Sequence, residues 1–183
     1  MKYKLILLLL IAVISVTTIP VKLTAQKASY NEAITVDPLN FLLNSIVNAK
    51  YEKKLSPTNS YTIGALLIYR TTSGQSSGTW MGYGLSGSYR WYYDLFKTRQ
   101  KAIQGFSFGP RASLSYYGFS GDHNVSDDNA TVITIGGEAM YKWVWDSFVL
   151  ETGILLDFPL YGHKDLPWTY GTFGLNAAIG YAW

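Results

Sequence analysis

The 183-residue chain has no cysteine, only two histidines, and only 15% charged residues. Without cysteine, no disulfide can staple the fold. The charge-free run near the N-terminus, residues 5–16, is too short to span a bilayer as a helix. The sequence also lacks a glycine-rich phosphate loop and a calcium-loop pattern. We therefore expect no cofactor and no metal.

The first 25 residues have the layout of a secretory signal peptide. Lys2 and Lys4 precede the apolar run, and Ala25 is a small residue at which cleavage is expected. An uncleaved N-terminal membrane anchor is the alternative. Removing residues 1–25 takes away three of the 15 basic residues and no acidic one, which leaves 12 of each sign. This balance gives no indication of a nucleic-acid partner, and we expect one exported domain, residues 26–183.

The C-terminal stretch alternates along its length. From Gly171 to Trp183, every second residue after the glycine is apolar, and the residues between are mostly small or polar. A soluble sheet hides such an apolar face, whereas a membrane barrel turns it toward lipid and keeps polar side chains inside. The stretch ends on Trp183, with Tyr181 and Ile179 at the alternate positions before it.

The same alternation recurs and predicts eight antiparallel strands. They cover approximately residues 31–42, 45–54, 60–70, 80–93, 105–118, 130–145, 148–161 and 169–183. Asn44-Ser45 and Asp146-Ser147 are predicted as tight turns. Pro110 predicts a bulge or irregularity in its strand, because proline cannot donate a ladder hydrogen bond. Residues 71–79, 119–129 and 162–168 read as polar loops, and residues 94–104 as a longer connection. In the third strand, Leu66 and Ile68 make the second face less polar than the pattern requires.

Aromatic residues on the apolar face gather toward the two predicted ends. The belt nearer the C-terminus consists of Tyr51, Tyr61, Trp91, Tyr93, Phe106, Trp143, Trp145, Phe148, Tyr181 and Trp183. The looser second belt consists of Tyr69, Met81, Tyr83, Tyr116, Phe158 and Phe173. Aromatic girdles of this kind flank the apolar band of outer-membrane barrels.

On these features, nearly all of residues 26–183 resembles the small bacterial outer-membrane barrels typified by the OmpA transmembrane domain and OmpX. Pro38, Pro110 and the long 94–104 connection depart from that family's pattern. The resemblance implies an all-β, eight-stranded antiparallel transmembrane up-and-down β-barrel. It implies location in the outer membrane and contact with its lipid. It also implies recognition by the barrel-insertion machinery through Ile179, Tyr181 and Trp183.

The predicted inner face carries nine charged residues, which are Asp37, Lys50, Glu52, Arg90, Arg111, Glu138, Lys142, Glu151 and Asp157. An eight-stranded barrel is just wide enough to be filled by side chains. Buried charges there must pair, since an isolated one costs several kcal/mol. We expect a filled lumen, with Arg111 and Glu138 as one ion pair. A proton or ion path is the sharper alternative.

Hairpin arithmetic predicts a second ion pair. If Asp146-Ser147 is a two-residue loop, Lys142 lies opposite Glu151 on the inner face. Arg90 and Glu52 lie at a similar height on other strands and would extend this pair into a network.

Three functions fit this pattern. We favour a non-enzymatic envelope structural or surface-interaction protein whose external loops contact an unknown surface ligand. A lipid-modifying enzyme, such as a deacylase or acyltransferase, would use His123 or His163 in the predicted loops. A soluble lipocalin-like carrier would hide its apolar face around a ligand. A porin-like diffusion pore fits poorly with a filled lumen.

Overall fold

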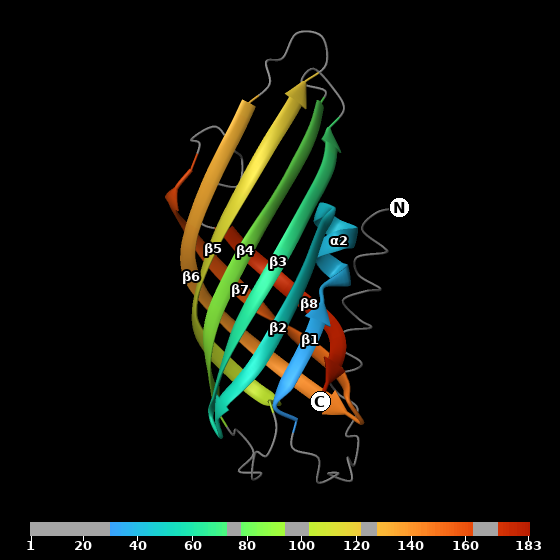
Figure 1. The fold of residues 1–183 in the computed structure, drawn as a ribbon, viewed down its shortest axis with the longest axis vertical. Helices are drawn as coiled ribbons and strands as arrows, with labels where there is room; N and C mark the ends of the chain where they lie inside the picture. Colours follow the sequence, from blue (N-terminus) through green and yellow to red (C-terminus); the bar gives the residue numbers. More distant parts are fainter. Residues whose placement is uncertain (1–29, 73–77, 94–102, 122–127, 163–171) are drawn as a thin grey trace.

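The computed structural model describes residues 30–72, 78–93, 103–121, 128–162 and 172–183. These residues form a closed antiparallel barrel in which each strand pairs with its neighbours in sequence and β8 pairs with β1 (Figure 1). The strands are β1 (Glu32–Val36), β2 (Ile46–Ser56), β3 (Asn59–Thr72), β4 (Gly78–Tyr93), β5 (Gly105–Gly121), β6 (Asp128–Trp145), β7 (Phe148–Tyr161) and β8 (Thr172–Ala182). This architecture confirms the predicted fold class. The predicted signal peptide (residues 1–25), His123 and His163 lie outside the described residues.

The chain enters and leaves the barrel at one end, which we call the proximal end. There the backbone N–H groups of Asn31 and Glu32 both donate to the carbonyl of Trp183, at 3.0 and 3.1 Å. The β2–β3 and β6–β7 hairpins also turn at this end. We call the opposite end distal. Strands β3 to β6 rise furthest toward it, whereas β1 and β2 end well below them (Figure 1).

The turn between β6 and β7 has two residues, as predicted. Asp146 and Ser147 have positive φ angles of 42° and 73°, which is the requirement of a type I′ hairpin turn. The turn places Trp145 opposite Phe148 and Lys142 opposite Glu151. The register of the hairpin therefore follows from two residues, because turn type and loop length fix the pairing.

The barrel wall has an apolar outer face. Large apolar side chains from every strand are exposed there, for example Ile34, Val47, Leu67, Tyr83, Leu114, Ile135, Leu156 and Tyr181. Inner positions of β2, β4, β6 and β7 carry the buried charged residues of the barrel. The alternation along each strand thus gives an apolar outside and a polar inside, the reverse of a soluble sheet.

The first predicted strand is wrong beyond Val36, and so is the turn predicted at Asn44-Ser45. Helix α2 (Pro38–Asn44) occupies this part of the wall, and Ser45 caps its C-terminus in the left-handed conformation at φ 57°. Asp37 is the N-cap, where its carboxylate accepts the backbone N–H of Asn40 at 2.9 Å. A capping aspartate followed by proline at the first helical turn is a typical helix start. Among the described residues, no helix is long and apolar enough to cross a membrane.

Pro110 lies in an interruption of the β4–β5 pairing, as predicted. The ladder runs from Gly78 to Ser88 and resumes at Trp91 opposite Phe108 without a change of register. A Cβ atom on Gly109 would lie 1.8 Å from the backbone oxygen of Tyr89, so only glycine fits this close approach. Pro110 and Gly137 are among the residues that line an apolar groove of about 370 Å³ on the outer face.

Candidate functional site in the barrel interior

An apolar layer closes the proximal end of the barrel. It consists of Ala33, Tyr92, Ile103, Val144, Val149 and Ala182, with Tyr30 packed against them. Ile103 precedes β5 and is only 1% exposed. Tyr30 also accepts the backbone N–H of Ser147 at 3.2 Å. We call this layer the proximal seal.

Directly above the seal, the Arg90 guanidinium contacts three carboxylates. Its Nε donates to Glu138 at 2.5 Å, and Nη1 donates to Glu52 at 2.8 Å and to Glu151 at 2.7 Å. Arg90 is 1% exposed. A planar guanidinium with five donors suits a site where several carboxylates converge, because each oxygen can receive a directed hydrogen bond.

Two lysines complete this cluster. Lys142 binds both Glu52 and Glu151, the latter at 3.2 Å. Lys50 lies 3.3 Å from Glu151. We call these six residues (Lys50, Glu52, Arg90, Glu138, Lys142 and Glu151) the charge cluster, and all are buried. Three positive groups face three negative ones, so each buried charge is compensated, as burial in a low dielectric requires.

Neutral side chains satisfy the remaining oxygen atoms of the cluster. Ser60 and Tyr92 donate to Glu52 at 2.5 and 2.6 Å, and Ser88 donates to Glu138 at 2.6 Å. Asn176 accepts from Lys50 at 2.7 Å. The sequence reasoning missed these residues, although the alternation of β4 and β8 places Tyr92 and Asn176 on the inner face. The sequence has no comparable signal for the buried position of Ile103, because this residue precedes β5 and lies outside the strand alternation.

The predicted pair of Arg111 with Glu138 is wrong. Arg111 instead lies 3.3 Å from Asp157, while Glu138 binds Arg90. Arg111 and Asp157 lie on strands separated by one other strand, and so do Glu138 and Arg90. In both pairs, the strand between the partners has a glycine at the same height. Gly136 is opposite both Arg111 and Asp157. Gly109 is opposite Glu138, and the unchanged β4–β5 register sets it against Arg90. The long side chains of each pair therefore meet across a glycine, which has no side chain to separate them.

Asp37, the ninth predicted interior charge, stays outside the cluster. It is 3% exposed and caps α2, and its second oxygen has no hydrogen-bond partner among the described residues. Of the nine charged residues, the structure thus joins six in the cluster, pairs Arg111 with Asp157, and uses Asp37 to begin a helix.

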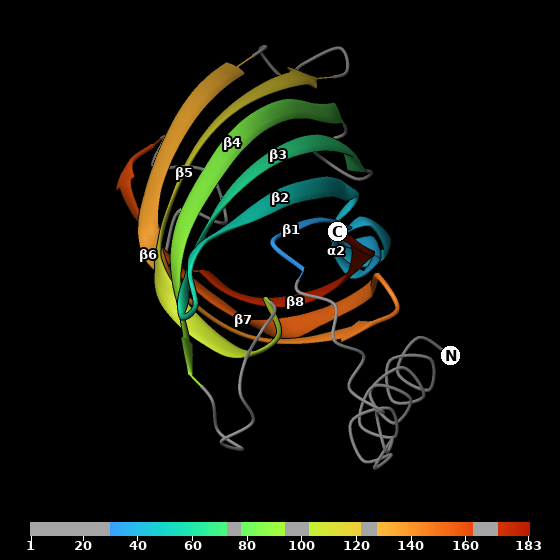
Figure 2. The ribbon, with the colours of Figure 1, turned by 60° about the horizontal axis from the view of Figure 1, so that its bottom comes forward.

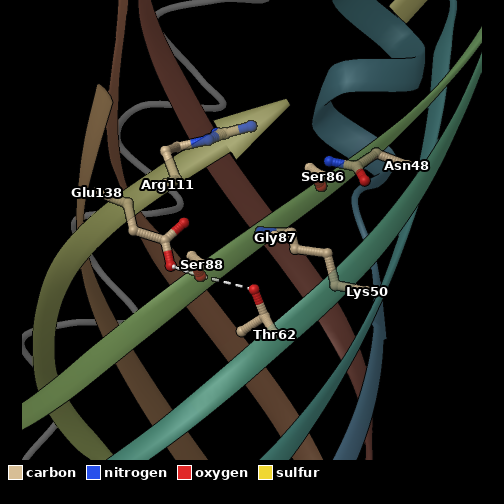
Figure 3. A pocket seen from close by; sticks show the side chains of 8 residues that line it. All are labelled: Asn48, Lys50, Thr62, Ser86, Gly87, Ser88, Arg111 and Glu138. Atoms are coloured by element: carbon tan, nitrogen blue, oxygen red, sulfur yellow. Dashed lines mark hydrogen bonds between the residues drawn. The ribbon is translucent and has the colours of Figure 1, made fainter. Parts of the chain in front are cut away.

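A small polar pocket lies above the charge cluster (Figure 3). Its volume is about 10 Å³, room for one water molecule. The lining residues are Asn48, Lys50, Thr62, Ser86, Gly87, Ser88, Arg111 and Glu138. Figure 3 shows Arg111 and Asn48 on the upper side of this pocket, with Thr62 and Ser88 joined below.

The inner face turns apolar again toward the distal end. Ile46, Leu66, Ile68, Trp80 and Tyr117 are half-buried there, and Val132 packs with Ala130 against Trp80 and Tyr117. We call the part of the interior lined by Ile46, Leu66, Ile68, Trp80, Tyr117 and Val132 the distal lumen. Ile46, Leu66 and Ile68 form one apolar group, and Trp80, Tyr117 and Val132 form the other. Gly82 and Gly84 lie between the two groups, opposite Ile68 and Leu66. Buried charged side chains thus fill the proximal interior, whereas apolar side chains, several of them half-buried, line the distal interior.

Within the described interior, the charged groups of the charge cluster are paired with one another. No group of three or more histidine, cysteine, aspartate or glutamate side chains within the described residues could hold a metal ion. The carboxylates of the charge cluster are engaged with lysine and arginine. Strong mutual pairing favours a rigid, closed layer.

The barrel is similar in fold to a known outer-membrane protein. It superposes on the crystal structure of Ail, the attachment invasion locus protein of Yersinia pestis, with a TM-score of 0.54 and 10% sequence identity. The match covers 85% of this chain and 100% of that one. No protein-family model matches the chain. No curated protein matches it in sequence. The similarity shows the small eight-stranded barrel fold.

Proposed function

We propose that the mature chain is an outer-membrane barrel with its proximal end toward the periplasm, and that it acts as a non-enzymatic envelope structural or surface-interaction protein. One observation carries this proposal: an exposed apolar face surrounds a buried, charge-balanced interior. In water this arrangement would expose the apolar face to solvent and bury the charged one. In lipid the closed ladder pairs the backbones of neighbouring strands, and the residues of the charge cluster neutralise one another.

The aromatic residues support this placement. At the proximal end, ring contacts link Tyr61, Tyr51, Trp183 and Tyr181 in one group, with centroid distances of 6.1–6.5 Å. A second group on β6 and β7 links Tyr141, Trp143, Trp145 and Phe148 at 4.4–6.4 Å. Rings with a polar edge suit the boundary between hydrocarbon and headgroups. The proximal end thus has the character of a membrane interface.

A closed interior argues against a conduit. The proximal seal and the charge cluster lie one above the other, and the most buried large side chains, Arg90 and Lys142, cross the lumen. We expect no sustained conductance of porin size in planar bilayers. A stable open channel would contradict the filling of the proximal half.

The surface role is assigned to the sequence between β3 and β4, between β5 and β6, and between β7 and β8. The strand ends that flank these connections lie at the distal end, which the proposed orientation places outside the cell. The name of the structural neighbour refers to attachment and invasion, and a surface-contact role for this chain is compatible with the shared fold.

Cell fractionation tests the location. The mature chain, starting near Gln26, is expected in the outer-membrane fraction, with the terminal residues Ile179, Tyr181 and Trp183 required for insertion. Recovery as a soluble periplasmic protein would overturn the membrane placement and favour the carrier alternative.

Lipid analysis tests the enzymatic alternative. Mass spectra of envelope lipids from cells with and without the protein are expected to agree. A difference that disappears in His123→Ala or His163→Ala would instead establish a lipid-modifying activity at the predicted loops.

A further inference from the structure

One ion pair of the described residues lies on the outer face of the barrel. Lys53 on β2 is opposite Glu32 on β1, and the two side chains meet at 3.1 Å. These side chains are 48% and 27% exposed. In the other ion pairs among the described residues, no side chain is more than 16% exposed. We call Lys53 and Glu32 the outer pair, because it faces the surroundings of the barrel and not its interior.

The backbone around the outer pair is fixed where the barrel closes. Figure 2 shows β1 between β2 and β8 at the proximal end. The backbone N–H of Glu32 donates to the carbonyl of Trp183 at 3.1 Å, and Trp183 donates back to Glu32 at 2.9 Å. On the other side, Lys54 donates its backbone N–H to Asn31 at 2.8 Å. Both charged residues are thus held side by side, which lowers the cost of ordering them around a ligand.

Three aromatic rings adjoin the outer pair. The ring centroid of Tyr51 lies 6.5 Å from that of Tyr61 and 6.5 Å from that of Trp183. Tyr61 is opposite Lys53 in the β2–β3 ladder. The side chains of Tyr51 and Trp183 also interact with the Glu32 carboxylate. We call the outer pair and these three rings the rim site.

The charges of the rim site indicate its depth in the membrane. A charged side chain on the lipid face of a barrel is costly at the bilayer midplane and nearly free of cost near the interface. Lys53 lies close to the proximal end of β2, which finishes at Ser56, and Trp183 follows the end of β8. The long stem of a lysine can also lie along apolar surface while its ammonium stays among headgroups. In the proposed orientation, the rim site therefore lies where the hydrocarbon of the periplasmic leaflet meets its headgroups.

The two charges of the rim site match a headgroup that carries both signs. The Lys53 ammonium has three N–H donors and is paired with Glu32, so a lipid phosphate can accept another of them. The Glu32 carboxylate can accept an N–H from a primary ammonium, and aromatic rings attract a cation over their faces. A lipid with a phosphate and no ammonium would be attracted by Lys53 and repelled by Glu32. The outer pair therefore favours a zwitterionic lipid over an anionic one.

We propose that the rim site binds the headgroup of a zwitterionic phospholipid with a primary ammonium, the phosphoethanolamine class, in the periplasmic leaflet. Lys53 binds the phosphate, Glu32 accepts the ammonium, and Tyr51 and Trp183 flank that cation. This inference rests on the proposed membrane location. An exposed ion pair contributes little to stability by itself, so lipid recognition gives the outer pair a role that its own attraction does not.

Lipid retention tests the proposal. The mature chain is folded into vesicles of equal parts phosphatidylethanolamine and phosphatidylglycerol with identical acyl chains. It is then extracted in mild detergent, and native mass spectrometry identifies the lipid that stays bound to the intact barrel. Retained phosphatidylethanolamine is expected to exceed phosphatidylglycerol about threefold, a ratio that suits the weak energies of exposed charge contacts. Equal retention of the two lipids would overturn the proposal.

Opposite charge changes separate the two contacts. Glu32→Gln removes the partner of the ammonium and keeps Lys53, so the preference is expected to reverse in favour of phosphatidylglycerol. Lys53→Met removes the partner of the phosphate and is expected to lower the retention of both lipids. Circular dichroism checks that each variant is folded, and the measurement on the parent chain decides the proposal even where a variant does not fold. A pair with only a structural role would leave the lipid ratio unchanged in both folded variants, which would contradict the proposal.

Phosphatidylcholine tests the hydrogen bond to the ammonium. Its cation is quaternary and has no N–H to donate, so Glu32 attracts it without accepting a hydrogen bond. In vesicles where phosphatidylcholine replaces phosphatidylethanolamine, the excess over phosphatidylglycerol is expected to be smaller. An equal excess would overturn the assignment of a primary ammonium.

A neutral substitution and vesicle flotation complete the test. Ile34→Val changes the next outward position of β1, which is 49% exposed, and should leave the lipid ratio of the parent unchanged. A change as large as that of Glu32→Gln would mean that packing sets the ratio, and would overturn the proposal. A chain that floats with the vesicles and retains both lipids equally contradicts this inference alone. A chain that does not float with the vesicles contradicts the membrane location, and the inference with it.

Discussion

The two halves of the barrel interior follow different packing rules, although the same strands build both. In the proximal half, large charged side chains are almost fully buried and each has several partners. In the distal half, Ile46, Leu66, Ile68 and Trp80 are half-buried inner residues, and Ala130 and Val132 are buried. The proximal half is fixed by the requirement that every buried charge be paired. The distal half has no such constraint, and its lining is free to serve another purpose.

The strongest expected contrast is between ion pairs in the two halves. Glu151→Ala removes a carboxylate that binds Arg90, Lys50 and Lys142, and leaves an uncompensated positive charge. We expect a loss of roughly 3–5 kcal/mol in the free energy of unfolding, measured in denaturant. Arg111→Ala removes one partner of a single pair next to the distal lumen, and about 1 kcal/mol is expected.

Thr152→Ala, on the outer face next to Glu151, serves as the control and should change stability by less than about 0.5 kcal/mol. An Arg111→Ala effect as large as that of Glu151→Ala would break the proposed contrast.

Core volume gives the next contrast. Val149 is 0% exposed within the proximal seal, so Val149→Phe overpacks it and should cost about 1–3 kcal/mol. Leu66→Phe enlarges a half-buried side chain in the distal lumen and should fall within about 0.5 kcal/mol of the parent. Thermal unfolding of the two variants in detergent measures both. Equal losses would mean that the distal lumen is packed as tightly as the seal.

The smallest expected effect is on the amount of assembled barrel, and it concerns the two ends of β8. Trp183→Ala removes the terminal aromatic residue beside Tyr51 and Tyr181, and is expected to lower the amount of barrel assembled in the outer membrane. Phe173→Ala removes a ring from the same face at the distal end, where it is 63% exposed, and assembly should be unchanged. Quantitative blotting of membrane fractions compares them, and a reversed order would argue against a terminal insertion signal.

The sequence predicted what short-range rules determine. Alternation located every strand, and the Asp146-Ser147 turn fixed the Lys142–Glu151 pairing, because a two-residue hairpin leaves one register. The partners of Arg111 and Glu138 could not be obtained in this way. Their strands are joined by long connections that leave the register open, and the contacts pass across Gly109 and Gly136.

Helix α2 was missed for a different reason. The alternation of Ile34 and Val36 continues weakly to Leu42, so the strand pattern was extended through Asp37-Pro38. The capping aspartate and the proline after it are the local signal that overrides this pattern.

The contrast between the fully buried charges of the proximal half and the half-buried lining of the distal half can be measured directly with two single-cysteine variants. Ser86 lines the polar pocket and is half-buried, whereas Ser107 is 1% exposed beside the charge cluster. Folded protein is exposed to a small water-soluble maleimide, and modification is followed by mass spectrometry. Ser86→Cys is expected to react while the barrel is folded, and Ser107→Cys only after denaturation. Equal rates at the two positions in the folded barrel would contradict the account.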